Sequence, residues 1–152
     1  PEVARYQSWS GMTEANAAAF VAEQAKQPVA VAAAWLQIAI ERKEAGEHIG
    51  DLALKTDGQG QAEIGYSLSR SFQGQGYASE AVRALHDYLF AELALHRVVA
   101  VADVRNVRST RLLERVGMRC EGHFIESFWF KGEWMDEYLY AILAREWPSV
   151  RG

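Results

Sequence analysis

Hydrophobic and polar positions alternate along three neighbouring segments in the first half of the chain. Together with several β-branched residues, this alternation predicts three strands, over residues 31–41, 48–55 and 61–68. Residues 57–60 (DGQG) have the composition of a tight hairpin turn. The three strands are therefore expected to form an antiparallel meander.

Three later segments also have the pattern of strands. Residues 97–104 (RVVAVADV) form a continuous apolar run, which is typical of a strand covered on both faces. Two longer segments close the chain, over residues 119–130 and 134–144, and they are joined at Lys131 and Gly132. These two are expected to form a hairpin.

Between the strands, the hydrophobic positions take the spacing of amphipathic helices. Thr13 is placed to cap a first helix that ends before Pro28. A second helix, over residues 78–93, has an apolar face made of Ala78, Ala81, Val82, Leu85, Leu89 and Leu93. A third covers residues 106–116 and ends at Gly117. This order of elements predicts an α/β fold with a mixed, largely antiparallel sheet flanked by helices.

Composition and charge narrow the class of protein. A chain of 152 residues is expected to form a single domain, over residues 1–152. Its net charge of −4 argues against direct binding of nucleic acid, which needs a basic surface. The four histidines lack metal-ligand spacing and the single cysteine cannot complete a zinc site, so no metal is expected. With no apolar run of membrane-spanning length and nothing like a signal peptide, we expect a cytoplasmic protein without a membrane partner.

The segment most informative about function is residues 73–78 (QGQGYA), between a predicted strand and a predicted helix. Glycines let the backbone approach a phosphate closely, and the N–H groups of a first helical turn have no acceptor within the helix. A strand, a glycine-rich turn and a helix start together favour an anion site. The same residues also suit an ordinary turn and helix cap.

The spacing Gln-x-x-Gly-x-Ala in this segment resembles the acyl-CoA pyrophosphate loop of the GNAT superfamily of N-acetyltransferases. From residue 49 to 147 the chain is similar to the branch that contains the ribosomal-protein alanine N-acetyltransferases (the RimJ/RimL type). The similar segments are 49–54 (IGDLAL), 62–68 (AEIGYSL), 73–82 (QGQGYASEAV), 106–118 (NVRSTRLLERVGM) and 132–143 (GEWMDEYLYAIL). The resemblance implies the GNAT fold and transfer of an acetyl group from acetyl-CoA to a primary amine. The amine would belong to a protein N-terminus or a small molecule and attack directly in a ternary complex.

The resemblance also implies where acetyl-CoA binds. In the superfamily, the strands corresponding to residues 61–68 and 97–104 splay apart, and the pantetheine arm lies between them like an extra strand. A backbone N–H around Ser67 to Ser69, a range that includes Leu68, is expected to support the thioester carbonyl. The other implied contacts to acetyl-CoA are those of Gln73, Gly74, Gln75, Gly76, Tyr77, Ala78, Ser79, Asn106, Ser109 and Arg111.

Acetyl transfer needs one group that removes a proton from the amine and another that assists the leaving thiolate. Glu63 lies where several superfamily members carry the general base, although it also suits a solvated strand position. Many members place a tyrosine acid at the position of Leu113, so that role is vacant here. Ser109 instead matches a serine of the ribosomal-protein branch. Asn106 and Ser109 equally suit a helix cap.

Charged residues late in the chain add weaker candidates. Six arginines lie close together in the sequence: Arg97, Arg105, Arg108, Arg111, Arg115 and Arg119. They form either a solvated face or a surface for the 3′-phosphate of the cofactor or for ribosomal RNA. Arg108 and Arg111 are placed best for the phosphate. Glu121 and Glu126 are further candidates for holding the amine.

Two alternatives come from other classes of protein. Gly74, Gly76 and Ser79 nearly match a dinucleotide-binding fingerprint, and Asp103 ends the next predicted strand where a ribose-binding acid could lie. Against this, Ser79 replaces the third glycine, antiparallel strands precede the loop, and too few residues follow it for a second nucleotide-binding half. A non-catalytic acyl-CoA-binding regulator would keep the loop without needing the catalytic residues.

The start of the chain departs from the family pattern. Members usually begin with a further strand before the segment that matches residues 1–6 (PEVARY), whereas this chain starts at Pro1 without a methionine. We expect either a processed or incomplete chain or a sheet with an open edge. An open edge favours pairing with a second copy, so a homodimer is one expected outcome. The sequence does not identify the acceptor amine.

Overall fold

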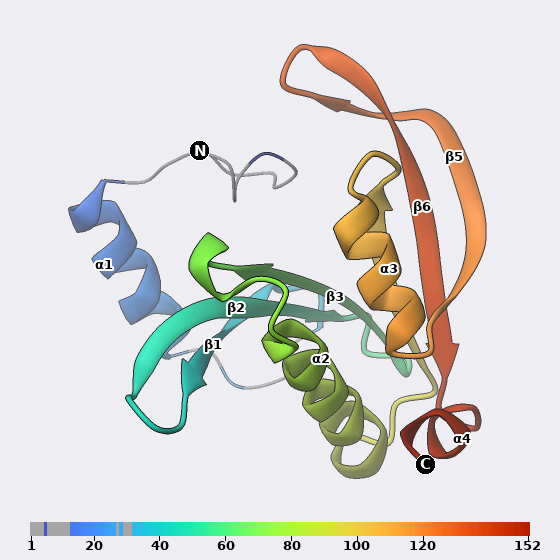
Figure 1. The fold of residues 1–152 in the computed structure, drawn as a ribbon, viewed down its shortest axis with the longest axis horizontal. Coiled ribbons are helices and arrows are strands. Elements are labelled where there is room, and N and C mark those ends of the chain that lie inside the picture. Colours follow the sequence, from blue (N-terminus) through green and yellow to red (C-terminus); the bar gives the residue numbers. More distant parts are fainter. Residues whose placement is uncertain (1–4, 6–12, 27, 29–31) are drawn as a thin grey trace.

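The computed structural model describes residues 5, 13–26, 28 and 32–152 (Figure 1). Its strands are β1 (Leu36–Arg42), β2 (Glu47–Thr56), β3 (Gln61–Leu68), β4 (Arg97–Asp103), β5 (Arg119–Phe130) and β6 (Glu133–Leu143). Its helices are α1 (Glu14–Gln24), α2 (Tyr77–Asp87), α3 (Val107–Arg115) and α4 (Trp147–Arg151), with two short helical turns, η2 (Arg70–Phe72) and η3 (Tyr88–Glu92). The order agrees with the prediction and adds α4, which the hydrophobic pattern did not indicate.

All six strands belong to one sheet, in the order β1-β2-β3-β4-β6-β5. Neighbouring strands are antiparallel, apart from β3 and β4, which run parallel. The predicted α/β class with a mixed, largely antiparallel sheet is therefore confirmed, as are the meander and the final hairpin. In Figure 1 the meander and the β5–β6 hairpin run in clearly different directions.

The turn between β2 and β3 is held by the carboxylate of Asp57. This carboxylate accepts hydrogen bonds from the N–H groups of Gln59 and Gln61, at 2.7 and 2.9 Å. The bonds from Gln61 and Gln59 favour the ionised form, so they lower the pKa of Asp57. The turn fixes the register, which runs from Thr56 opposite Ala62 to Gly50 opposite Leu68.

Strand β1 begins later than predicted. The strand expected from residue 31, which itself lies outside the described residues, starts only at Leu36, opposite Leu54. The reason is local: Ala33 has a φ of 66°, in the left-handed region that a strand cannot contain. Ala32 makes only an isolated parallel bridge to Thr56.

Helices α2, α3 and α4 supply the helical part of the core. Their buried side chains in this core are Val82, Leu85, Leu89, Leu112, Leu113, Val116 and Trp147, where Leu89 lies in the turn after α2 and Val116 just after α3. The apolar face predicted for residues 78–93 is thus confirmed, although regular α-helix ends at Asp87 and a wider turn continues to Glu92. The expectation that β4 is covered on both faces is wrong at Val101. This side chain is 42% exposed because it faces an open cavity.

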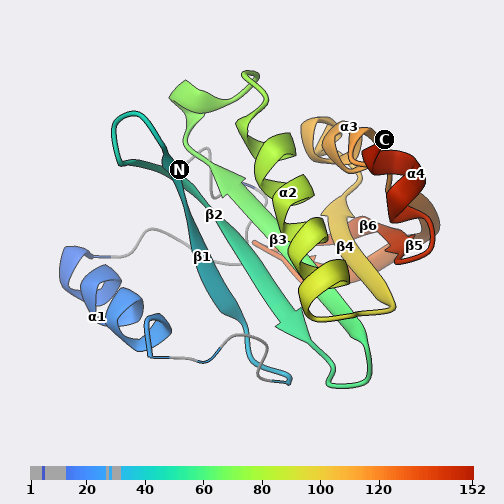
Figure 2. The same ribbon diagram turned by 90° about the horizontal axis from the view of Figure 1, so that it is seen from below.

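Helix α1 lies apart from the other helices, beyond β1 (Figure 2). Thr13 caps it as predicted, since its hydroxyl accepts a hydrogen bond from the N–H of Asn16 at 3.3 Å. No residue of α1 is buried. The N–H of Gln37 donates to the side-chain oxygen of Gln24 at 2.9 Å, which ties the end of α1 to β1.

A histidine is enclosed between α2 and α4. The ring of His86 is fully buried against Trp147, with the two ring centroids 5.0 Å apart. Neither ring nitrogen has a hydrogen-bond partner among the described residues. Burial lowers the pKa of His86 to about 4, so the ring is neutral near pH 7.

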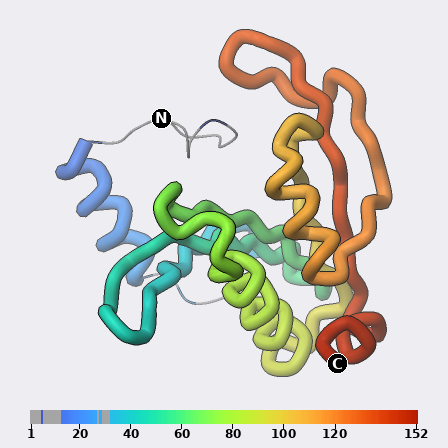
Figure 3. Tube along the Cα trace, in the orientation of Figure 1, coloured from blue at the N-terminus to red at the C-terminus, as the bar shows by residue number. Residues whose placement is uncertain are grey.

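The β5–β6 hairpin extends past α3 (Figure 3). Its exposed apolar side chains are Phe124, Ile125, Phe128, Trp129 and Trp134. Lys131 and Gly132 form its turn with φ values of 49° and 90°, as a two-residue hairpin turn requires. Among the described residues, no helix is long and apolar enough to cross a membrane.

Candidate active site

The parallel strands β3 and β4 separate near the middle of the sheet. They pair only from Gln61 opposite Arg97 to Glu63 opposite Val99. Beyond Glu63, β3 stays paired with β2 as far as Leu68, while β4 stays paired with β6. The strands therefore splay apart as expected, and the second half of β3 lacks a neighbour on the side that β4 has left.

The backbone of β3 directs particular N–H groups into this gap. The N–H of Ser69 donates to the carbonyl of Ile49 at 2.8 Å, so it is already bonded to the neighbouring strand, β2. N–H directions alternate along a strand, so Ser67 also faces β2, while Tyr66 and Leu68 face the gap. Of the range from Ser67 to Ser69, only the N–H of Leu68 points to where the thioester carbonyl was expected.

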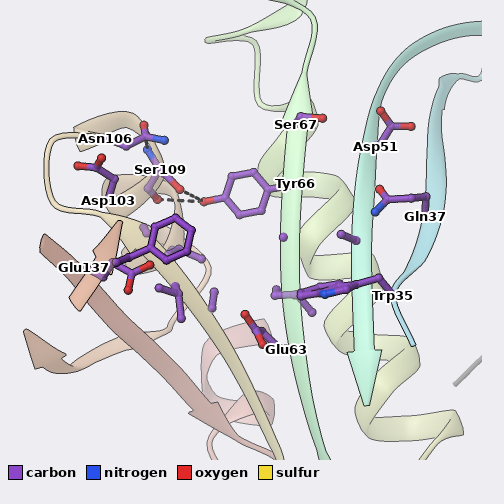
Figure 4. Close-up of a pocket in the computed structure, with 18 of the residues that line it drawn as sticks. Trp35, Gln37, Asp51, Glu63, Tyr66, Ser67, Asp103, Asn106, Ser109 and Glu137 are labelled. Carbon is purple, nitrogen blue, oxygen red and sulfur yellow. Dashed lines mark hydrogen bonds between the residues drawn. The ribbon is translucent and has the colours of Figure 1, made fainter. Parts of the chain in front are cut away.

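A cavity of about 450 Å³ opens at the gap (Figure 4). Its walls come from five parts of the chain: α1, the meander, β4, the start of α3 and the β5–β6 hairpin. The polar residues that line it are Gln24, Gln37, Asp51, Glu63, Tyr66, Ser67, Asp103, Asn106, Ser109 and Glu137. Both residues predicted to be catalytic, Glu63 and Ser109, lie in this lining.

Glu63 enters the cavity from the part of β3 that is still paired with β4. Its carboxylate lies 3.1 Å from the ammonium of Lys55, its cross-strand neighbour on β2. The same ammonium stands 4.7 Å from the ring centroid of Trp35, which also lines the cavity. The carboxylate thus lies between the Lys55 ammonium and the open cavity, where an amine could reach it.

Ser109 and Asn106 lie at the start of α3, on the other side of the gap. Asn106 caps the helix as expected, since its side-chain oxygen accepts the N–H of Ser109 at 3.2 Å. The side chain of Ser109 makes a different contact: its hydroxyl lies 2.7 Å from that of Tyr66. The Tyr66 hydroxyl also lies 3.1 Å from the carbonyl oxygen of Ser109. Leu113, one turn further along α3, has a buried aliphatic side chain, so its position supplies no acid.

The glycine-rich loop leads directly into α2. Gly74 and Gly76 have φ values of 77° and 91°, and a Cβ at either would have no atom within 4 Å, so the space above both is open. Gly76 is the N-cap of α2, and the N–H groups from Gly76 to Ser79 have no acceptor within the helix. Open space, exposed N–H groups and the positive end of a helix together fit a pyrophosphate.

Gln73 connects this loop to both sides of the gap. Its amide nitrogen donates to the carbonyl of Leu68, and its amide oxygen accepts from Arg108 on α3, both at 2.9 Å. The side chain of Gln73 therefore holds the loop in place, and Arg108 is engaged with it. Arg111 is exposed on α3.

Most of the other arginines singled out in the sequence pair with acids. Arg97 pairs with Glu121, Arg105 with Asp103 and Glu133, and Arg119 with Glu121 and Glu146. Arg97 and Arg119 lower the pKa of Glu121. Neither Glu121 nor Glu126 lines the cavity. The described residues contain no cluster of three or more His, Cys, Asp or Glu side chains that could hold a metal ion.

Sequence reasoning missed the residue that joins the two walls of the gap, Tyr66. The alternation along β3 indicates that Tyr66 faces the helices, opposite in direction to Ser67. Nothing in the sequence indicates that it meets Ser109, which lies 43 positions later. The carboxylates of Asp51 and Glu137 in the cavity were missed for the same reason, because each comes from a different strand, and Asp103 was considered only as a ribose-binding acid.

Comparisons with known proteins agree with the resemblance. Residues 1–119 match the family model of the acetyltransferase (GNAT) domain. The uncharacterized N-acetyltransferase YnaD of Bacillus subtilis is 45% identical over 85 residues, which cover 56% of this chain and 50% of that protein. The [ribosomal protein uS5]-alanine N-acetyltransferase of Escherichia coli is 33% identical over 88 residues, covering 58% of this chain and 45% of that protein. The matched part spans about half the length of these two curated relatives.

A solved structure of a GNAT acetyltransferase has the same fold as this chain. The crystal structure of an acetyltransferase (GNAT family) from Bacillus anthracis superimposes with a TM-score of 0.85 at 32% identity. The superposition covers 95% of this chain and 83% of that chain. The expected fold is confirmed, and the match to the uS5-alanine enzyme agrees with the RimJ/RimL-type branch.

Proposed function

Because the chain belongs to the GNAT acetyltransferase family, we propose that it transfers an acetyl group from acetyl-CoA to a primary amine, by direct attack in a ternary complex. The acceptor is a protein N-terminus or a small molecule. One observation carries this proposal: β3 and β4 separate beside a glycine-rich helix start, and the cavity at the separation contains both a carboxylate and a hydroxyl. Such a gap fits a pantetheine arm, and the helix start fits its pyrophosphate.

Two groups of residues are proposed to bind different parts of acetyl-CoA. N–H groups from Gly74 to Ser79 hold the pyrophosphate, with Gln73 keeping the loop against β3. Asn106 and Arg111, on the α3 side, contact the pantetheine arm and the 3′-phosphate. Acetyl-CoA, when bound, supplies the reactive thioester.

Three groups of the chain then act on the reacting atoms. Glu63 accepts the proton of the attacking amine, directly or through water. The N–H of Leu68 donates to the thioester oxygen as negative charge develops on it. The hydroxyl of Ser109 donates a hydrogen bond to the leaving sulfur. The position of each group on a wall of the gap supports the role proposed for it.

The proposal is tested by measuring thiol release from acetyl-CoA with a panel of amines. The panel contains peptides with free N-termini, polyamines and aminoglycosides, and the control for each is the same molecule with its amines already acetylated. We expect thiol release with at least one free amine and none with its control. Binding of acetyl-CoA without release by any amine would favour the regulator instead. Absence of both binding and release would contradict the proposal altogether.

A further inference from the structure

The side chain of Tyr66 spans the gap between β3 and α3. Backbone pairing of β3 with β4 ends at Glu63, and three residues later Tyr66 reaches across to Ser109 (Figure 4). We propose that Tyr66 is a positioning residue, whose hydroxyl orients the hydroxyl of Ser109 towards the leaving sulfur. This inference rests on the proposed function, and it adds a residue that neither the motifs nor the family match assign.

The hydrogen bonds at this contact allow two arrangements. The Tyr66 hydroxyl lies within reach of both oxygens of Ser109, at 3.1 Å from the carbonyl and 2.7 Å from the hydroxyl. If the phenol donates to the carbonyl, it accepts the serine proton, which is then not offered to a substrate. If the phenol donates to the serine hydroxyl, the serine proton is free to point into the cavity.

Only the second arrangement lets Ser109 act on a substrate. A bound sulfur that gains negative charge attracts the serine proton, and the phenol proton then turns from the carbonyl to the serine oxygen. A hydroxyl that accepts one hydrogen bond becomes a better donor in the next, because hydrogen bonds in a chain polarise one another. Tyr66 thus strengthens the donor that faces the leaving group, without itself donating to the sulfur.

Two features of the surroundings fix this contact. The cap from Asn106 holds the backbone of Ser109, and the contact with Tyr66 holds its hydroxyl oxygen, which leaves the rotation of the hydroxyl proton. Burial raises the pKa of Tyr66 to about 12, which keeps the phenol protonated at the pH of any ordinary assay. Tyr66 is therefore available as a neutral donor throughout the catalytic pH range.

The test is a double-mutant cycle on the turnover number. Tyr66→Phe keeps the ring and removes the hydroxyl, so we expect kcat to fall by about 3- to 10-fold, the value of one hydrogen bond. KM for acetyl-CoA should stay within about 2-fold of the original, because the lost interaction acts in the transition state. In a Ser109→Ala background, Tyr66→Phe should cause no further loss of kcat.

Tyr140→Phe is the matched control. Tyr140 is also a buried tyrosine with a pKa raised to about 12, and its hydroxyl lies 3.1 Å from Glu114 on the same helix, α3. It does not line the cavity, so its variant should keep the kcat of the original protein. The hydroxyl of Tyr66 contacts Ser109, which lines the cavity, whereas the hydroxyl of Tyr140 contacts Glu114, which does not.

The outcomes separate the two proposals. If Tyr66→Phe and Ser109→Ala lower kcat independently, or if Tyr66→Phe behaves like Tyr140→Phe, the positioning role is wrong while acetyl transfer stands. If the unaltered protein releases no thiol with any amine of the panel, acetyl transfer itself is wrong and the role of Tyr66 is wrong with it.

Discussion

Replacing Gly76 by valine tests whether the start of α2 binds the pyrophosphate. Gly76 has a φ of 91°, and the space where a side chain would extend is open. That space is where a phosphate must come to reach the N–H groups from Gly76 to Ser79. A Cβ at Gly76 would meet no atom within 4 Å, so a valine side chain would extend into this space.

The expected effect has two parts of known size. A side chain in the left-handed region costs about 1–3 kcal/mol of folding stability through backbone strain. Loss of two charge-assisted hydrogen bonds to the pyrophosphate costs about 3 kcal/mol of binding free energy at the lower limit of their range. A loss of that size weakens the affinity for acetyl-CoA by about 100-fold or more.

Gly132 provides a control with the same backbone geometry. Its φ is 90° and its surroundings are equally open, but it lies in the turn between β5 and β6. Gly132→Val should therefore lose similar stability in thermal unfolding while keeping its affinity for acetyl-CoA in calorimetry. Unchanged affinity in a folded Gly76→Val protein would refute the pyrophosphate site, as would an equal loss of affinity in both variants.

Three further predictions concern the catalytic groups and the core. Glu63→Gln should lower kcat/KM by about 100-fold and flatten the rise of the rate with pH, measured with one acceptor of known amine pKa; an unchanged profile would assign proton removal elsewhere. Ser109→Ala should lower kcat by about 10- to 100-fold with little change in acetyl-CoA affinity, whereas preserved kcat with lower thermal stability would leave Ser109 a purely structural role. His86 should destabilise the fold in acid: its pKa falls from 6.5 when unfolded to about 4 when folded, so the unfolded chain binds the proton first. Stability should then decrease as pH falls from about 6.5 to about 4, by at most about 3 kcal/mol. Urea unfolding of His86→Leu should lack this part of the decrease, and an identical pH dependence in both proteins would contradict the assignment.

Local sequence signals predicted the elements because each depends on neighbouring residues. The turn at Asp57 and the bounds of β3 follow from composition and alternation, which act over a few positions. The start of β1 was predicted too early, because nothing in this strand-like segment of the sequence indicates the left-handed conformation of Ala33. The contact of Tyr66 with Ser109 depends on how far β3 and β4 separate, which only the assembled sheet determines. The family pattern singles out Glu63 and Ser109 as candidates. It does not indicate the residues that they contact, Lys55 and Tyr66.

The loose attachment of α1 sets substitutions in this helix apart from substitutions elsewhere around the cavity. Phe20 and Gln24 of α1 line the cavity, yet α1 contributes no buried residue to the core. Substitutions along α1 therefore cost little folding free energy, and its amides should exchange hydrogen far faster than those of β3 or β4. Helices α2 and α3, which we propose to hold the donor, contribute buried side chains to the core and should tolerate fewer changes. Substitutions on the α1 wall of the cavity should therefore alter the proposed acceptor preference at little cost in stability, whereas substitutions at the proposed acetyl-CoA site should not.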